Sequence, residues 1–334
     1  MAKNFPITLV TILAAGGIAL TGCGGSNGTE STGQNGQTAD GGVEPETSEI
    51  TVADTAGMPS TFLEYGVEEG FFEDQGLTVN VDVSIGGAAA VPAVVSGSVQ
   101  MAGSNSVSAI IAHDKGLPIQ IVAAGTRAAD QPEEDFARIV VPADSQIETV
   151  ADLENKTVAV NTLENINDVT IKTLMDDAGA DSSTVEFAEM GFPDMLPALD
   201  NNQVDAALLI EPFVSMAEQG DTVAIASPYV ETMPELMVGT YLTSAEFIEN
   251  NPETVAAFQR GLEATGAAIQ EDPTAFRAAL PEKSNIDPEL AEGVRLPVWR
   301  AEVDRESLDF LNEKMAEYGL LEEPTDIEPL VYDE

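Results

Sequence analysis

Hydrophobic and polar residues alternate along the chain in a pattern that predicts strands and helices in turn. Between residues 77 and 85 every second position is Leu, Val or Ile, which is typical of a strand. Three shorter apolar runs predict further strands at 50–53, 99–103 and 118–125. The segments between them predict helices at 60–69, with Ser60 as the N-cap, and at 88–95 and 105–113. This alternating order favours an α/β fold with a parallel, doubly wound sheet.

The same rhythm returns in a second unit. Strands are expected at 138–141, 157–161, 185–188, 204–210 and 223–225, and helices at 168–178, 193–200 and 211–219. Segment 204–210 is almost entirely apolar, as expected of a strand that is covered on both faces. Residues 236–242 are expected to be extended, and everything after Ser244 is expected to be helical, at 252–271, 273–280, 288–295 and 304–319.

Several motifs in this frame carry a family resemblance. They are GGAAAV at 86–91 with SGSV at 96–99, VAVNTL at 158–163 running into INDVT at 166–170, and FPDM at 192–195 with VDAA at 204–207 and EPF at 211–213. Together they resemble the substrate-binding lipoproteins of ABC importers for nitrate, sulfonates, taurine and thiamine precursors of the pyrimidine type. The resemblance covers about residues 49–243, and the helical tail has a consistent length.

The resemblance implies two α/β lobes of the periplasmic-binding-protein type, each an open, mostly parallel sheet flanked by helices, with a helical C-terminal segment. Lobe 1 would comprise residues 49–140 and 239–334, and lobe 2 residues 141–238. The lobes would close over a small polar molecule and deliver it to ABC permease subunits. A ligand receptor for a sensor has the same sequence features and remains an alternative.

The N-terminal region predicts export and attachment to a membrane. Cys23 is the only cysteine, and it directly follows Leu20-Thr21-Gly22. An apolar run that begins at residue 7 precedes it, and Lys3 lies before that run. This arrangement resembles the lipobox of bacterial lipoproteins, with residues 1–22 as signal peptide and lipid on Cys23. The run is shorter than the roughly 20 residues that span a bilayer. Residues 23–48 are mostly polar and small, which predicts a flexible tether. We therefore expect an extracytoplasmic protein that contacts the membrane through its lipid anchor only.

The charge is strongly acidic, with 58 Asp and Glu residues against 13 Lys and Arg, a formal net charge of −45. Binding to nucleic acid requires clusters of basic residues, and the sequence has none, so this function class is excluded. The acidic surface is expected to keep the protein hydrated and soluble. We expect a monomer.

Candidate ligand-binding residues follow from the expected sheets. Ligands of open α/β sheets lie at the carboxyl ends of the strands, where the N–H groups of helix N-termini are also exposed. The candidates at these places are Met58, Gly86, Gly87, Ala88, Ser104, Asn105, Ser106, Arg127, Asn161, Asn165, Asn167, Asp168, Phe192 and Glu211. Several have a structural alternative: Ser104–Ser106, Asn167 and Asp168 as helix caps, Glu211 as a first-turn acid, and Phe192 as a core residue.

The charges at the strand ends leave the ligand class open. Arg127 either binds a sulfonate, nitrate or carboxylate, or forms a solvated ion pair with the acids at 130–135. The other charged residues at these ends are Asp54, Asp168, Asp194 and Glu211. If most of them face the cleft, an amine or a protonated ring fits better than a simple anion. A zwitterion such as taurine or a pyrimidine-type heterocycle satisfies both sets.

Catalytic function has little support in the sequence. His113 is the only histidine and is expected on the surface, so no pairing with a nucleophile and no histidine metal cluster is available. The related fungal enzymes that make the thiamine pyrimidine depend on a cysteine-rich segment, which the body of this chain lacks. We therefore expect no catalytic residue, metal or cofactor, and keep the biosynthetic enzyme only as a remote alternative.

Overall fold

A computed structural model describes residues 44–83, 87–284 and 286–333. The predicted signal peptide, Cys23, most of the predicted tether and Gly86 lie outside these residues. Glu46 and Thr47, which we assigned to the end of the tether, are hydrogen-bonded to the N-terminus of a helix that begins at Pro252. The Glu46 carboxylate accepts hydrogen bonds from the Thr254 amide and hydroxyl, and the Thr47 amide donates to the Thr254 hydroxyl. The folded body therefore begins before residue 48.

The first sheet has five strands. In spatial order they are β2 (Thr78–Asp82), β1 (Glu49–Ala53), β3 (Met101–Asn105), β11 (Gly239–Ser244) and β4 (Ile119–Ala124). β2, β1 and β3 pair in parallel, and β11 lies antiparallel between β3 and β4. Four of the five strands therefore run in one direction, so their carboxyl ends lie at one edge of the sheet. β11 enters this sheet from far along the chain.

Helices cover both faces of the first sheet because its strands alternate their apolar side chains. Ile50 and Val52 of β1 face a core with α1 (Met58–Glu68), α9 (Pro252–Glu271) and α10 (Pro273–Ser284). Ala53 faces the opposite side, which is covered by α2 (Ala90–Val95) and α3 (Ser106–Asp114). Two shorter helices, α8 (Ala245–Asn250) and α11 (Pro288–Ala291), lie in the C-terminal half.

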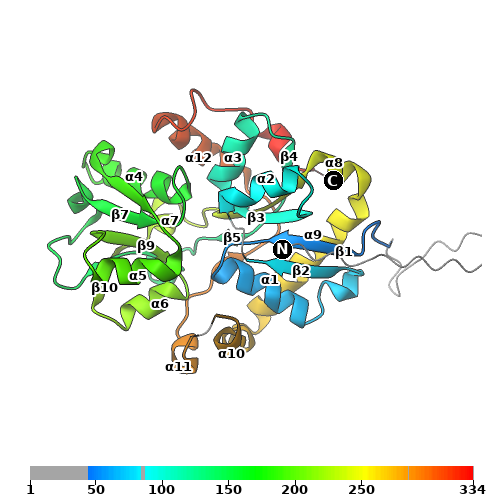
Figure 1. The fold of residues 1–334 in the computed structure, drawn as a ribbon, viewed down its shortest axis with the longest axis horizontal. Coiled ribbons are helices and arrows are strands. Elements are labelled where there is room, and N and C mark those ends of the chain that lie inside the picture. Colours follow the sequence, from blue (N-terminus) through cyan, green and yellow to red (C-terminus); the bar gives the residue numbers. More distant parts are fainter. Residues whose placement is uncertain (1–43, 84–86, 285, 334) are drawn as a thin grey trace, which may run out of the picture. The chain divides into compact units, whose positions relative to one another are not determined.

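The second sheet also has five strands. In spatial order they are β10 (Thr222–Ala226), β6 (Ala137–Pro142), β9 (Ala206–Ile210), β7 (Thr157–Val160) and β8 (Glu186–Glu189). β6 is antiparallel to both of its neighbours, whereas β9, β7 and β8 are parallel. Figure 1 shows α4 (Ile166–Asp177) and α7 (Pro228–Thr232) on one side of this sheet and α5 (Phe192–Asp200) and α6 (Phe213–Glu218) on the other.

Two crossovers connect the sheets, and a third segment, which contains a short strand, pairs with one of them. The first crossover contains β5 (Thr126–Arg127), and the second runs antiparallel to it, with Val238 N donating to the Thr126 carbonyl at 3.0 Å. β12 (Val298–Trp299) pairs with the other edge of β5. The expectation that everything after Ser244 is helical was therefore wrong at Val298–Trp299. Residue 140, at which we expected lobe 1 to end, lies inside β6 and so within the second sheet.

The hydrophobic cores do not follow the two sheets one by one. α12 (Arg305–Glu317) contacts both α3 and α4, and Leu308, Leu311 and Met315 on it are fully buried. One hydrophobic cluster therefore continues from a face of the first sheet into the second, and the other cluster lies between α1, α9, α10 and the opposite face. Local boundaries also moved: α1 begins after Gly57 rather than at Ser60, and α4 begins at Ile166 with Asn165 as its N-cap.

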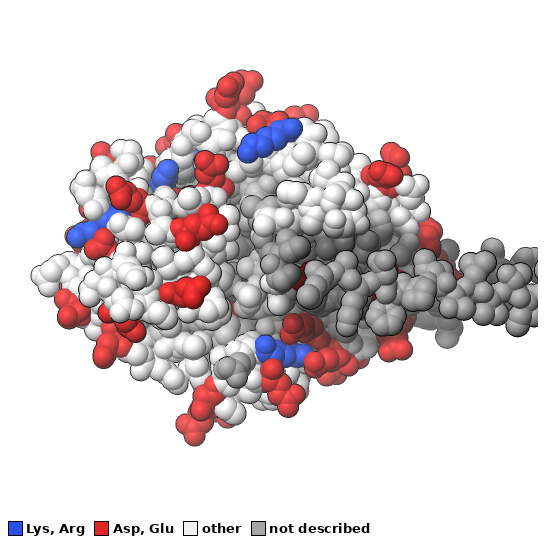
Figure 2. Space-filling model, viewed as in Figure 1, with Lys and Arg blue, Asp and Glu red and all other residues white. Residues whose placement is uncertain are grey.

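The acidic surface leads to a prediction about salt. Figure 2 shows acidic side chains spread over the visible face with few basic ones among them. With a net charge of −45, these like charges repel one another, and ions screen the repulsion over about 10 Å at 0.1 M salt. We expect the melting temperature to rise between low salt and 1 M NaCl, and to rise equally in KCl. A melting temperature that does not change with salt would contradict this prediction.

No helix in the described part of the chain is long and apolar enough to cross a membrane.

Candidate functional site

A cleft lies where the carboxyl ends of strands from both sheets meet. It contains about 560 Å³ of space not filled by atoms, counting its open mouth. Seven residues that the sequence analysis selected line it: Gly87, Ser104, Asn105, Asn161, Asn165, Asn167 and Phe192. They come from both sheets and from the loops that follow their strands. The structure therefore brings together residues that are far apart in the sequence.

Asp54 is the acidic residue of the cleft. It follows β1, is 2% exposed, and accepts hydrogen bonds from Thr55 N at 2.7 Å and from the Tyr241 hydroxyl at 3.2 Å. The carboxyl group occupies space left by Gly103 on β3, because a Cβ there would lie 2.1 Å from Asp54 Oδ1. Burial raises the pKa of Asp54 to about 7, although both hydrogen bonds oppose the shift. The group is therefore close to its titration point at neutral pH.

Two hydroxyl-bearing residues of the first sheet, Ser104 and Thr240, also line the cleft. Ser104 on β3 and Thr240 on β11 are directly opposite each other in the antiparallel pair. Both hydroxyl oxygens are buried, and neither forms a hydrogen bond with any described residue. Because unpaired buried polar groups cost free energy, such hydroxyls are suited to bind a ligand. Asn105, the next residue, is the N-cap of α3, because its side chain accepts a hydrogen bond from Ser108 N. Helix capping was the structural alternative to ligand binding for this residue.

The second sheet contributes a chain of hydrogen bonds to the opposite wall. The Tyr229 hydroxyl on α7 donates to Asn167 Oδ1 at 2.6 Å, and Asn167 Nδ2 donates to Asn161 Oδ1 at 2.9 Å. These bonds orient the Asn161 amide so that its N–H₂ group remains available as a donor. Asn165 Oδ1 accepts a hydrogen bond from Ile166 N as the N-cap of α4.

Aromatic rings add apolar surface to the cleft. Phe192 lines it and stacks on Phe213, with ring centroids 5.8 Å apart. Phe136 and Tyr229 line it as a second pair, with centroids 5.5 Å apart. A planar ligand would therefore meet rings that their neighbours already hold in place.

Four of the remaining sequence-predicted residues lie outside the lining. Met58 is buried, and its amide donates to the Glu211 carbonyl. The Ser106 hydroxyl donates to the Met237 carbonyl at 2.6 Å. Asp168 accepts a hydrogen bond from Glu164 N at 2.7 Å, and burial raises its pKa to about 7. Ala88 belongs to a short 3₁₀ turn, Gly87–Ala89, that enters α2.

Arg127 is bound to the C-terminal segment rather than to the acids at 130–135 that the sequence suggested as partners. Its guanidinium donates to the Glu302 carbonyl and lies 3.6 Å from Asp304 Oδ2. Burial lowers the pKa of Arg127, and the carboxylate of Asp304 opposes the shift. Arg127 therefore braces the crossover between the sheets and does not line the cleft.

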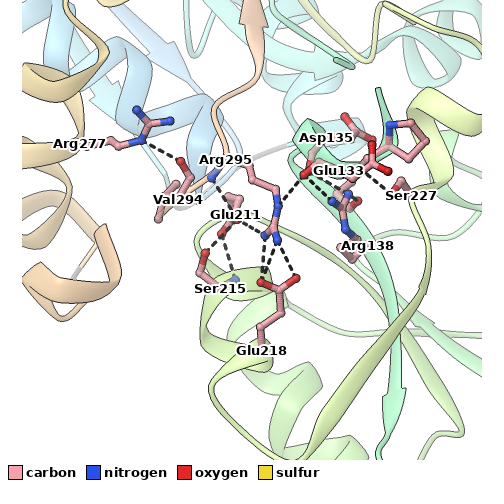
Figure 3. Close-up of polar contacts among 12 residues, drawn as sticks. Glu133, Asp135, Arg138, Glu211, Ser215, Glu218, Ser227, Arg277, Val294 and Arg295 are labelled. Atoms are coloured by element: carbon pink, nitrogen blue, oxygen red, sulfur yellow. Dashed lines mark hydrogen bonds and ion pairs between the residues drawn. The ribbon is translucent and has the colours of Figure 1, made fainter. Parts of the chain in front are cut away.

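Glu211 is buried in an ion-pair network that the sequence did not predict. Figure 3 shows Arg295 reaching Glu211, Glu218 and the Glu133 carbonyl at once. Ser215 also donates to Glu211, from its amide at 3.0 Å and its hydroxyl at 2.9 Å. Burial raises the pKa of Glu211, although these donors oppose the shift. Its carboxylate is therefore held by Arg295 and Ser215 of the protein itself.

Comparisons with known proteins agree with this fold. The family model described as "NMT1/THI5 like" matches residues 60–276. That match covers more than half of the chain. The chain belongs to the NMT1/THI5-like family.

The sequence identity between this chain and individual relatives is low. A formylaminopyrimidine-binding protein of Halalkalibacterium halodurans is 24% identical over 273 residues, which are 81% of this chain and 78% of the relative. The structure of the alkanesulfonate-binding protein SsuA from Xanthomonas axonopodis pv. citri superimposes with a TM-score of 0.70, at 16% identity, over 86% of this chain and 99% of that one. The nitrate-binding protein NrtA from Synechocystis PCC 6803 gives 0.68, at 14% identity, over 86% of this chain and 85% of that one. The predicted family resemblance and periplasmic-binding-protein fold are confirmed.

Sequence reasoning missed several cleft residues of this NMT1/THI5-like protein. Asp54 was grouped with the strand-end acids but was not selected, and Tyr229, Tyr241 and Thr240 were not considered. Tyr241 and Thr240 lie on β11, the antiparallel strand, whose direction the sequence pattern does not reveal. The signal that could have found Asp54 was its position directly after the first strand.

Proposed function

We propose that this protein is the extracytoplasmic solute-binding subunit of an ABC importer. It would be anchored by lipid on Cys23, capture a small polar organic molecule between its two lobes, and deliver it to the permease. The NMT1/THI5-like family, the periplasmic-binding-protein fold and the cleft between two sheets support this role. His113, whose Nε2 lies 2.9 Å from the Asp326 carbonyl, does not line the cleft, which supports binding rather than catalysis.

For the ligand we propose a pyrimidine-type heterocycle rather than a sulfonate or nitrate. The observation that carries this choice is the charge of the cleft: its described lining includes Asp54 and no Lys, Arg or His. A buried anion without a charged partner is costly to desolvate, whereas a heterocycle with N–H groups can satisfy the acid and the neutral donors. The name of the Halalkalibacterium relative points to the same ligand class.

A thermal-shift screen of the purified body, residues 44–334, tests this proposal. The probes are formylaminopyrimidine, taurine, an alkanesulfonate and nitrate. A ligand at about 100 times its dissociation constant stabilises the native state by about 2.7 kcal/mol, which is readily detected. We expect formylaminopyrimidine to raise the melting temperature and nitrate to leave it unchanged. Stabilisation by the alkanesulfonate or nitrate alone would contradict the proposed ligand class.

Replacing Asn161 with alanine should weaken binding of formylaminopyrimidine about tenfold. The variant removes an oriented N–H₂ donor and leaves its ligand partner unsatisfied, which costs roughly 1–3 kcal/mol. Calorimetric titration measures the affinity. Asn250→Ala on α8 is the matched control, because that side chain is exposed and bonds only to the Glu246 carbonyl. Equal affinities of the two variants would remove Asn161 from the site.

A further inference from the structure

The surroundings of Asp54 restrict what can bind to it. Its Oδ1 already accepts a hydrogen bond from Thr55 N, and its Oδ2 accepts one from the Tyr241 hydroxyl. Each carboxylate oxygen has two lone pairs, so one acceptor position on each oxygen remains for a ligand. Gly103 gives the carboxyl group its place, and a larger residue there would displace it. Asp54 is therefore presented to the cleft as a planar pair of oxygens in a fixed orientation.

The charged side chain that acts on Asp54, Glu64 on α1, is also acidic and raises its pKa further. The Asp54 amide donates to the backbone carbonyl of Asp82 at the end of β2. β3 and β11, which pack on its other sides, carry Tyr241 as their only ionisable side chain. The wall across the cleft presents the amides of Asn161, Asn165 and Asn167. Among the described residues around Asp54, positive charge must therefore come from a proton or from the ligand.

An aminopyrimidine edge meets this arrangement with one mismatch. Its amino N–H can donate to one carboxylate oxygen, but the adjacent ring nitrogen then directs a lone pair at the other oxygen. A single proton between the ring nitrogen and that oxygen removes the repulsion, whether it resides mainly on nitrogen or on oxygen. The unpaired hydroxyls of Ser104 and Thr240 are available for further polar groups of the same ligand.

We infer that Asp54 selects the ligand by binding an N–H donor beside a ring nitrogen, and that the complex takes up one proton from solvent above neutral pH. This inference rests on the proposed function and goes beyond it, because it names the residue that sets charge preference and adds a dependence on pH. Burial raises the pKa of free Asp54 to about 7, so above that pH the proton comes from the buffer.

Calorimetric titration of formylaminopyrimidine at pH 8, in buffers of different ionisation enthalpy, counts the protons. We expect uptake of about one proton per ligand, and an affinity that falls up to about tenfold per pH unit above neutrality. Asp54→Asn should bind with no uptake and little dependence on pH, because an amide can donate to the ring nitrogen and accept from the amino group. Asp135→Asn is the control: its carboxyl is also buried, with a pKa raised to about 6, but it lies outside the cleft.

The titration of Asp54 can also be measured without ligand, through its effect on the melting temperature. An acid whose pKa is raised on folding contributes stability below its unfolded pKa, and this contribution is lost as pH rises through the folded pKa. The melting temperature of the wild type should therefore fall relative to Asp54→Asn between about pH 4 and pH 7, and not further above pH 7. A difference that is independent of pH would overturn the titration of Asp54.

The outcomes separate the inference from the proposed function. Binding of formylaminopyrimidine with no proton uptake, or with the same uptake in Asp54→Asn, would overturn the inference and leave the solute-binding role intact. Binding of nitrate or the alkanesulfonate in place of the pyrimidine would overturn both the inference and the proposed ligand class. If no probe binds, the pyrimidine-type ligand and the role of Asp54 in selecting it are both contradicted.

Discussion

Replacing Arg295 with alanine is expected to lower the free energy of unfolding by about 3 kcal/mol. The Glu211 side chain is fully buried, and Arg295 is its charged partner, with Nη1 at 3.2 Å from Oε1. Removing one partner of a buried ion pair leaves the other charge uncompensated, which costs about 3–5 kcal/mol. We expect the lower end of this range because Arg295 itself is 24% exposed and Glu211 can take up a proton.

Denaturant unfolding measures this loss, and the chain offers a matched control. Arg300 pairs with Glu235 at 2.6 Å, but its side chain is 51% exposed, so Arg300→Ala should cost at most about 1 kcal/mol. The loss in Arg295→Ala should shrink as the pH falls, because Glu211 is then neutralised by a proton. Adding Glu211→Gln to Arg295→Ala should restore part of the stability. Similar losses in Arg295→Ala and Arg300→Ala would show that the Glu211 network is not important for stability.

Replacing Gly103 with alanine is expected to weaken binding of formylaminopyrimidine about a hundredfold. The added Cβ would lie 2.1 Å from Asp54 Oδ1 and 2.4 Å from its Cγ, so the carboxyl group must leave its position. A hydrogen bond to a charged group contributes about 1.5–3 kcal/mol, and 2.8 kcal/mol is about a hundredfold in affinity. Calorimetric titration gives the change directly.

The matched control is Gly220→Ala, in the turn after α6. A Cβ at Gly220 would approach only the Ala217 carbonyl, at 3.4 Å, and the residue lies outside the cleft. Its affinity should equal that of the wild type. Thermal unfolding of Gly103→Ala shows whether the variant is folded. The added methyl group strains β3, but it also displaces the Asp54 carboxylate from its buried position, and the loss of this buried charge offsets part of the strain. A folded Gly103→Ala with unchanged affinity would mean that the ligand does not contact Asp54.

Local sequence signals predicted most elements well. The helix expected at 252–271 is α9 with the same bounds, because Pro252 begins it and Pro273 follows its end. Seven of the fourteen candidate residues line the cleft, and most of them were chosen by one rule, that polar residues after parallel strands meet at one edge of a sheet. Gly87, Ser104 and Asn161 are examples, since each follows or ends a predicted strand. Such signals are local, so they can be read without knowing what packs against them.

Residues whose role depends on distant partners could not be assigned in this way. Arg127 and Glu211 stand at predicted strand ends like the cleft residues, yet each is bound by a segment near residue 300. Glu211 is 84 residues from Arg295, and Arg127 is 175 residues from Glu302. The short pairing of β12 with β5 brings this segment to the crossover. Two residues per strand are too few to produce a recognisable pattern.

The sequence by itself determined the alternation of strands and helices, the family, the acidic surface and the edge of each sheet at which the cleft lies. It did so because periodicity, charge and turn residues act within a few positions of one another. Only the tertiary structure decided that β11 enters the first sheet with Tyr241 and Thr240, that Gly103 makes room for a buried Asp54, and that Arg295 occupies Glu211. These facts depend on which surfaces pack together, and packing joins residues that no local pattern connects.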